Sequence, residues 1–312
     1  GINLTGNGYG QILQGSAGDN VLDGGGSVDT FYGLGGDDWY YVSHASEKIV
    51  ESAGNGTDRV LASVSYVLRE QQHVEILSTN DNAGTASINL TGNSFDQVLQ
   101  GNAGNNVLDG GGGIDTYYGL GGNDWYYIDH NSENVAETAG GGIDRVLAST
   151  SYTLREGKHV EILSTQDNAG IARINLTGNR YDQTVQGNDG INILNGKGGN
   201  DILIGLGGDD IFVLNSALDA QNNVDTIFGF DSGDDRIALE SDIFGNLAQG
   251  RLTAEAFANG SAVTEADDRI LYNPESGALL FDADGSGSSA AIQFATINTG
   301  LTDLSATDFI VI

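Results

Sequence analysis

The chain has 312 residues, and its 43 aspartate and glutamate residues outnumber its 12 lysine and arginine residues, which gives a formal net charge of −31. A compact chain with this charge repels itself, and it lacks the basic face by which proteins bind nucleic acid or an anionic membrane surface. Divalent cations are its natural partners. The absence of cysteine excludes disulfides and thiolate metal sites. No apolar run reaches the length of a transmembrane helix.

An 86-residue repeat organises most of the chain. The hexapeptide INLTGN begins at Ile2, Ile88 and Ile174, and the first two units match at most positions. The third unit keeps the opening and diverges after about Val213. We therefore expect three repeat units followed by a C-terminal cap, over residues 2–87, 88–173, 174–240 and 241–312.

Within each unit lies a finer repeat of nine residues, with glycine first, Asp, Asn or Gln sixth and a large apolar residue eighth; four copies occupy residues 6–41, 92–127 and 178–213. Glycines supply strained turn backbone, and the eighth residue points inward from a short strand. Two nonapeptides would form one coil with a strand in each of two sheets, which stacks Leu13 on Phe31 and Leu22 on Tyr40. The pattern predicts an all-β fold, a parallel β-roll or β-solenoid.

The core of such a roll is thin, because only one large apolar side chain is buried per nine residues, and the cost of ordering the backbone is large. A further stabiliser is needed. The turns offer carbonyl groups freed by glycine geometry and carboxylates at the sixth position. These hard oxygen ligands favour several Ca²⁺ ions over Mg²⁺, which keeps its waters, and over softer metals that need His or Cys.

The nonapeptides resemble the RTX (repeat-in-toxin) consensus G-G-x-G-x-D-x-U-x, where U is large and apolar. The resemblance implies a parallel β-roll with Ca²⁺ between neighbouring turns, and it implies metal ligands at the aspartates in the sixth position, Asp29, Asp38, Asp115, Asp124, Asp201 and Asp210. Amides occupy the sixth position of the other turns. We expect these to form weaker sites, the best of them where an asparagine faces an aspartate turn, at Asn20, Asn106 and Asn192.

The stretches 42–86 and 128–172 show strand patterns and are expected to continue the solenoid as longer coils without metal turns. Asp58 and Asp144 follow glycine-rich turns in these stretches; we expect them to stabilise the turns, with a ligand role as the alternative. The four histidines recur with the unit and are expected to be structural. The Trp-Tyr-Tyr clusters at Trp39 and Trp125 are expected in the core, with sugar stacking as the alternative.

Beyond the repeats, Asp225 heads a dense acidic segment that is either one more cation site or a solvated turn. Short helices are expected around Ser241–Leu247 and Thr253–Ala258, and a β-hairpin over 269–282. Asp282 and Asp284 copy the first half of an EF-hand loop, although Gln293 stands where its closing glutamate is expected. We keep both aspartates as candidate calcium ligands.

The C-terminal segment Asp308-Phe309-Ile310-Val311-Ile312 resembles the tails of serralysin-type and other type I secreted proteins. The expected function is therefore the calcium-binding module of a secreted, extracellular bacterial protein that type I secretion machinery exports unfolded and that folds on Ca²⁺. No catalytic constellation is present, so we do not expect an enzyme. Two alternatives stay open: the tail of a larger secreted protease or lipase, and a calcium-dependent adhesin that binds extracellular polysaccharide.

Overall fold

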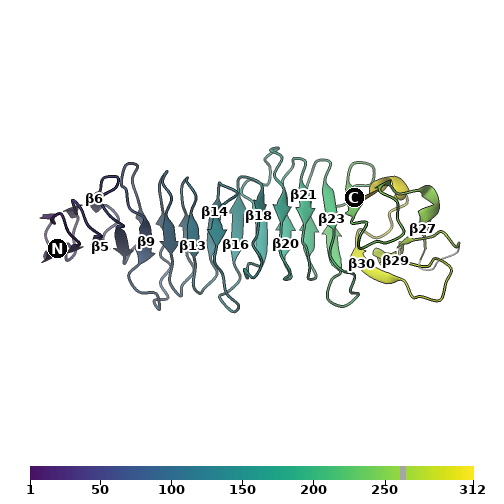
Figure 1. The fold of residues 1–312 in the computed structure, drawn as a ribbon, viewed down its shortest axis with the longest axis horizontal. Coiled ribbons are helices and arrows are strands. Elements are labelled where there is room, and N and C mark those ends of the chain that lie inside the picture. The colour runs from purple at the N-terminus through teal and green to yellow at the C-terminus, as the bar shows by residue number, and fades with distance from the viewer. Residues whose placement is uncertain (261–264) are drawn as a thin grey trace. The chain divides into compact units, whose positions relative to one another are not determined.

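The computed structural model describes residues 1–260 and 265–312, which form two compact units. Unit 1 comprises residues 1–147 and 158–160, and unit 2 comprises residues 148–157 and 161–312. In both units short β-strands follow one another at regular intervals, as Figure 1 shows. The all-β class and the parallel β-solenoid are therefore confirmed.

Unit 1 stacks its strands in three parallel sets. One sheet contains, in order, β1 (Asn3–Thr5), β3 (Val21–Asp23), β5 (Trp39–Val42), β7 (Arg59–Ala62), β9 (Ile76–Thr79), β11 (Val98–Gln100), β13 (Thr116–Tyr118) and β15 (Asn134–Val135). A second contains β2 (Ile12–Gln14), β4 (Thr30–Tyr32) and β6 (Lys48–Val50). The third set pairs β8 (Tyr66–Val67), β10 (Leu90–Thr91), β12 (Val107–Asp109) and β14 (Trp125–Ile128), and β16 (Arg145–Ala148) follows it in the chain.

The register of these strands follows the nonapeptide repeat. Leu13 pairs with Phe31 and Leu22 pairs with Tyr40, as predicted, and all four side chains are buried. Because side chains alternate across a strand, each three-residue strand turns its middle residue inward and its two flanking residues outward. The core is therefore a set of single-residue columns, which is the thin core that the sequence indicates.

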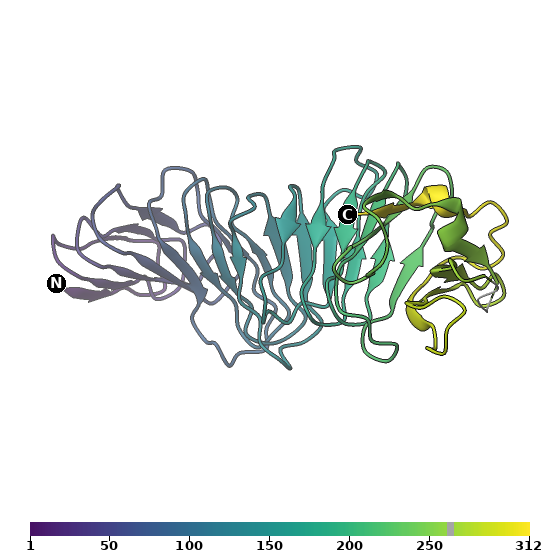
Figure 2. The same cartoon turned by 45° about the vertical axis from the view of Figure 1, so that its right-hand side comes forward.

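Unit 2 continues the same construction and ends in an irregular cap. One sheet contains β17 (Tyr152–Thr153), β19 (Leu176–Thr177), β21 (Ile193–Asn195), β23 (Ile211–Leu214), β25 (Arg236–Leu239), β31 (Phe309–Val311) and β26 (Gly250–Arg251). The other strands run in the order β18 (Ile162–Thr165), β20 (Thr184–Gln186), β22 (Ile202–Ile204), β24 (Asp225–Phe228), β30 (Ile292–Thr296), β29 (Ala278–Phe281), β28 (Ile270–Tyr272) and β27 (Phe257–Asn259). Figure 2 shows the cap segments, coloured from green to yellow, beside the last parallel strands of this unit.

The cap confirms one local prediction and corrects another. Strands β28 and β29 pair antiparallel and form the predicted hairpin. The two predicted helices are wrong: residues 241–246 form turns, and only Ala254–Ala256 form a short 3₁₀-helix, η1, before β27 begins. In the first of the two predicted helices, Asn246 adopts a left-handed φ of 73°, and an α-helix cannot continue through such a residue. Phe244 is instead buried against the rings of Phe281 and Phe294.

The C-terminal segment is part of the folded core. A second 3₁₀-helix, η2 (Ala306–Asp308), leads into β31, which pairs parallel with β25 and antiparallel with β26. Phe309 and Val311 are buried, and the carboxylate of Asp308 accepts hydrogen bonds from Ser232 Oγ at 3.0 Å and Ser305 N at 2.8 Å. Across the described ranges 1–260 and 265–312, no helix has the length and apolar character needed to cross a membrane.

Candidate metal centres

The nonapeptide turns fall into two classes with different backbones. In each turn that carries a sixth-position aspartate inside the blocks, the backbone is left-handed at its second and fourth residues, or close beside them, as at Leu34 (φ 81°) and Gly36 (φ 94°). None of the turns with a sixth-position amide has a positive φ at these residues. A left-handed leucine costs about 1–2 kcal/mol, so the aspartate turns hold strain that something must offset.

The amide turns satisfy their own polar groups. Asn106 Oδ1 accepts from Asn102 N at 2.8 Å, and its amide nitrogen donates to Ile88 O at 2.8 Å. Asn192 makes the same contacts with Asn188 N and Ile174 O, and Asn20 Oδ1 accepts from Ser16 N at 2.6 Å. The side-chain NH₂ thus donates hydrogen bonds to carbonyl groups that would otherwise need a cation. These asparagines are buried, but the turns that hold them are already hydrogen-bonded.

Five of the six aspartate turns leave one carboxylate oxygen without a hydrogen-bond partner among the described residues. Asp38 Oδ1 accepts from Asn20 N at 2.6 Å, whereas Asp38 Oδ2 is buried and accepts no hydrogen bond. The same buried, unpartnered Oδ2 occurs at Asp29, Asp115, Asp124 and Asp201. A buried charged oxygen without a partner is costly, and native proteins rarely keep one unless an ion completes it. The donor set therefore fits a hard cation such as Ca²⁺.

Burial also raises the pKa values of these carboxyl groups. Desolvation is the main cause, with nearby carboxylates adding to it, and it raises the pKa of Asp38 to about 6, that of Asp124 to about 7 and those of Asp115 and Asp201 to about 8. Without a cation these carboxyl groups consequently take up protons at higher pH in the folded chain than in the unfolded chain. With one, the ion takes the place of these protons.

A cluster of three carboxylates lies beside the last aspartate turn of the first block. Asp38, Glu51 and Asp58 are all buried and each offers an oxygen within 4.8 Å of the others. Asp38 N donates to Asp58 Oδ1 at 2.9 Å, and the hydroxyl of Tyr40 donates to Glu51. Asp58 therefore has the turn-stabilising role that the sequence indicates, and it also belongs to this cluster.

The cluster recurs one repeat unit later. Asp124, Glu137 and Asp144 are buried with oxygens within 4.8 Å of one another, and the hydroxyl of Tyr126 donates to Glu137. Sequence reasoning did not single out Glu51 or Glu137. Their signal is weak but readable, because they are identical acidic residues 86 positions apart, like the two aspartates that flank them.

In unit 2 the aspartates beyond the nonapeptides take the corresponding backbone contacts. Asp225 Oδ1 accepts from Asp201 N at 3.1 Å, and Asp235 Oδ1 accepts from Asp210 N at 2.9 Å. Burial raises the pKa of Asp225 to about 7. The acidic segment headed by Asp225 thus extends the same edge of turns and is more than a solvated loop.

The EF-hand-like segment is held by its own hydrogen bonds. Asp282 is buried and accepts from Asp284 N at 3.0 Å, whereas Asp284 is exposed and accepts from Ser289 N at 3.1 Å. Gln293, at the closing position, lies in β30 and donates to Thr296 Oγ1 at 3.0 Å. The two aspartates stay candidates, and within residues 1–260 and 265–312 no third acidic or histidine side chain completes a metal-binding group with them.

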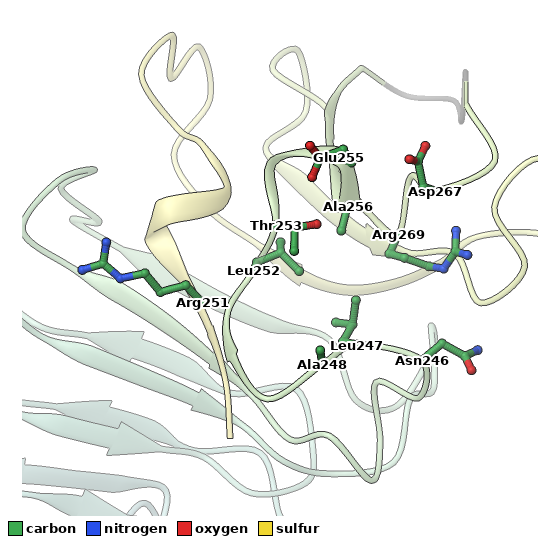
Figure 3. A pocket seen from close by; sticks show the side chains of 10 residues that line it. All are labelled: Asn246, Leu247, Ala248, Arg251, Leu252, Thr253, Glu255, Ala256, Asp267 and Arg269. Carbon is green, nitrogen blue, oxygen red and sulfur yellow. The ribbon is translucent and has the colours of Figure 1, made fainter.

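A pocket of about 390 Å³ in the cap of unit 2 brings together a different set of side chains. Figure 3 shows Arg251 and Arg269 pointing away from each other and Glu255 and Asp267 on one side of it. The lining residues contain no histidine and no serine. Among the histidines, His44 Nδ1 accepts from Ser46 N at 3.1 Å and the ring of His73 packs 4.2 Å from that of Phe95, which are structural contacts.

Comparison with protein families places the blocks. The model of the RTX calcium-binding nonapeptide repeat, which holds four copies, matches residues 5–40, 91–126 and 177–216. The chain carries RTX calcium-binding repeats folded as a β-roll. A search of curated proteins finds no matching relative. The family match establishes Ca²⁺ as the ion, and the three matched segments coincide with the predicted blocks to within a few residues. The RTX solenoid is a structural kind of domain rather than a catalytic one.

Proposed function

We propose that this chain is the calcium-dependent folding module of a secreted bacterial protein, exported unfolded by type I secretion machinery. The observation that carries the proposal is the row of buried, unpartnered Oδ2 atoms in the aspartate turns. Those atoms destabilise the folded state when no metal is bound. Ca²⁺ that binds only the folded chain therefore shifts the equilibrium toward folding by mass action. The net charge of −31 acts in the same direction.

The residues proposed to hold Ca²⁺ rank by what their oxygens already do. The aspartates of the blocks come first, Asp29, Asp38, Asp115, Asp124, Asp201 and Asp210, followed by Asp225. Asn20, Asn106 and Asn192 can contribute a second lone pair of an oxygen that already accepts a backbone N–H. They are proposed as auxiliary ligands at most. Asp282 and Asp284 come last, because both are engaged within their own loop.

The buried C-terminal strand supports export before folding. If Asp308 and Phe309 belong to the export signal, folding hides them, because Asp308 is hydrogen-bonded to Ser232 and Ser305 and Phe309 is fully buried. A chain that folded in a calcium-poor cytosol would present no accessible signal. Calcium-coupled folding therefore keeps the segment readable until the chain has left the cell.

Hydrogen exchange of the backbone amides tests this coupling. In millimolar Ca²⁺ the amides of β31 should be protected, and in excess chelator at pH 8 they should exchange as freely as those of an unfolded peptide. Protection of β31 that persists in chelator would show that the tail folds without the ion and would contradict the proposed order of events.

One surface feature favours a second, additional function, the binding of a neutral oligosaccharide. The core prediction is wrong for Trp39 and Trp125, which are 42 and 43 % exposed, while Tyr40 beside Trp39 is fully buried. The guanidinium of Arg59 lies 5.3 Å over the Trp39 ring. Together they form one wall of a groove of about 470 Å³, whose other polar side chains are those of Tyr41, Ser78, Thr79, Asn80, Asp81, Asn82 and Gln100.

An exposed aromatic ring beside amides and hydroxyls is the combination that stacks on and hydrogen-bonds to a sugar, and the surrounding negative charge disfavours anionic glycans. Calorimetric titration of the calcium-loaded protein with cellohexaose tests the idea. Binding should disappear in Trp39→Ala and persist in Tyr9→Ala, which removes a 79 % exposed aromatic side chain outside the groove. Equal binding by both variants, or none by the unmodified protein, would contradict this function.

A further inference from the structure

We infer that Glu51 joins Asp38 and Asp58 in a tricarboxylate calcium centre that the nonapeptides alone cannot form, and that Glu137 joins Asp124 and Asp144 in a second one. Each glutamate lies outside the matched repeats, in the stretch that was expected to lack metal turns. The inference rests on the proposed function, since Asp38 and Asp124 are sixth-position residues of the blocks.

The geometry of the first cluster suits one ion. Its three carboxylates each place an oxygen within 4.8 Å of the others, and Ca²⁺ binds oxygen at about 2.3–2.6 Å, so a single ion can contact all three. The exposures of Asp38, Glu51 and Asp58 are 0, 4 and 1 %. Three negative charges gathered in such a buried place need a counterion there.

The unpartnered oxygen points into the same space. Asp38 Oδ2 accepts no hydrogen bond, and a Cβ built on Gly33 would lie 2.1 Å from it and 2.2 Å from Glu51 Oε1. Only a residue without a side chain at Gly33 therefore lets the backbone pass this close to the point where the two carboxylates and the Tyr40 hydroxyl converge. Tyr40, which is fully buried, donates its hydroxyl to Glu51 and fixes the orientation of that carboxylate.

The glutamate also gives the centre a mechanical role. Glu51 follows β6 directly, and Asp58 directly precedes β7, so an ion bound by both would tie the segment between these strands to the turn of Asp38. The all-oxygen donor set favours Ca²⁺ over metals that prefer His or Cys. With three carboxylates the centre should bind Ca²⁺ more tightly than a turn pair with one aspartate and one amide.

The third block provides an internal comparison. There Asp235 Oδ1 accepts from Asp210 N as Asp58 Oδ1 does from Asp38 N. Within the part of the chain that the structure describes, no third acidic side chain completes a tricarboxylate group with this pair. The inference therefore predicts two tricarboxylate centres rather than three.

Ion counting by native mass spectrometry tests the inference on the whole chain. Glu51→Gln should bind one Ca²⁺ ion fewer than the unmodified protein, and the double variant E51Q/E137Q should bind two fewer. In the double variant the calcium concentration at the midpoint of folding should rise about tenfold or more, since each 1.4 kcal/mol lost corresponds to a tenfold change. The control E70Q/E156Q removes the same charge from two exposed glutamates that are also 86 residues apart and should retain every ion.

An unchanged ion count in E51Q/E137Q would overturn the inference while leaving the proposed function intact, whereas an unmodified chain that binds no Ca²⁺ would overturn both. If the double variant does not fold, terbium replaces calcium in Y40F/Y126F, which keeps every carboxylate. Loss of much of the tyrosine-excited terbium emission is then expected, and emission equal to that of the unmodified protein would count against the two centres.

Discussion

At the scale of single residues, the two oxygens of one carboxylate have opposite roles. Oδ1 of Asp38 caps the backbone of the preceding coil, a contact that needs no metal, while Oδ2 has no hydrogen-bond partner among the residues that the structure describes. Asparagine at the same position of an amide turn bonds with both ends of its side chain. The second polar atom of the sixth side chain, an amide nitrogen or a carboxylate oxygen, therefore decides whether a turn is stable without metal or requires an ion.

Asp38→Asn should invert the calcium dependence of stability at this site. In excess chelator at pH 8 the variant should be more stable than the unmodified protein by about 1–2 kcal/mol, because a buried, unsatisfied charge is removed. In millimolar Ca²⁺ it should be less stable, because the ion loses a carboxylate. Urea unfolding measures the stability in Ca²⁺, and because the metal-free chain is unfolded at pH 8, folding induced by trimethylamine N-oxide measures it in chelator.

The matched control is Asp37→Asn, which removes the same charge from an exposed neighbour whose Oδ1 accepts from Thr57 N at 2.8 Å. It should change stability in both buffers by less than about 0.5 kcal/mol, as surface substitutions usually do. A destabilisation of D38N in chelator equal to that in calcium would show that Asp38 is structural only.

At the scale of elements, each turn and the strand that follows it form one unit whose class is set by residue six. Aspartate turns carry left-handed residues such as Leu120 and Gly122, whereas the amide turns of the same block carry none at the equivalent positions. The strand after the Asp115 turn has the same length as the strands after the amide turns, and each buries its middle residue, whereas β14 after the Asp124 turn is one residue longer. The two classes of turn therefore differ mainly in the backbone of the turn itself.

Asn106→Asp should convert a turn that is stable without metal into one that depends on Ca²⁺. The change removes the N–H groups that serve Ile88 O and Asn102 Oδ1 and introduces a buried charge. In chelator we expect a loss of about 2–3 kcal/mol. In millimolar Ca²⁺ much of that loss should be recovered. A loss of the same size in both buffers, measured by urea unfolding in Ca²⁺ and by osmolyte-induced folding in chelator, would show that the turn cannot accept an ion.

An element could be predicted from the sequence where a local repeat pattern determines it, and could not where long-range contacts do. The strand stacking of Leu22 on Tyr40 was predictable, because strict nine-residue periodicity determines which side chains point inward. The contribution of Glu51 was not, because its partners are brought together by coils of unequal length. Trp39 was misjudged since it alternates with Tyr40 and so must face outward. The prediction of helices in the cap was wrong because buried aromatic contacts outweighed helix propensity.

At the scale of the whole molecule, protons and calcium compete for the same carboxylates. Burial raises the pKa values of Asp38, Asp58 and Asp115 to about 6, 7 and 8 in the folded state, against an ordinary value of 3.8 in the unfolded chain. Between about pH 4 and pH 8 the folded state therefore binds more protons than the unfolded state. The stability of the metal-free protein should fall as the pH rises through this window.

A chelator-treated sample should consequently retain more β-structure at pH 5 than at pH 8, and the calcium concentration needed for folding should decrease as the pH is lowered through 7 and 6, because protonation already stabilises the folded state. Far-ultraviolet circular dichroism across this range measures the first effect, and calcium titrations at each pH measure the second. Metal-free stability that rises with pH would show that the carboxylates are paired with donors rather than awaiting a cation.

The most direct test of the central claim is a calcium titration of the metal-stripped chain at pH 8, followed by far-ultraviolet circular dichroism. The account predicts an unfolded spectrum in excess chelator and a cooperative gain of β-structure on adding Ca²⁺, which equal Mg²⁺ does not reproduce. A full β-sheet spectrum in chelator, unchanged by Ca²⁺, would contradict it.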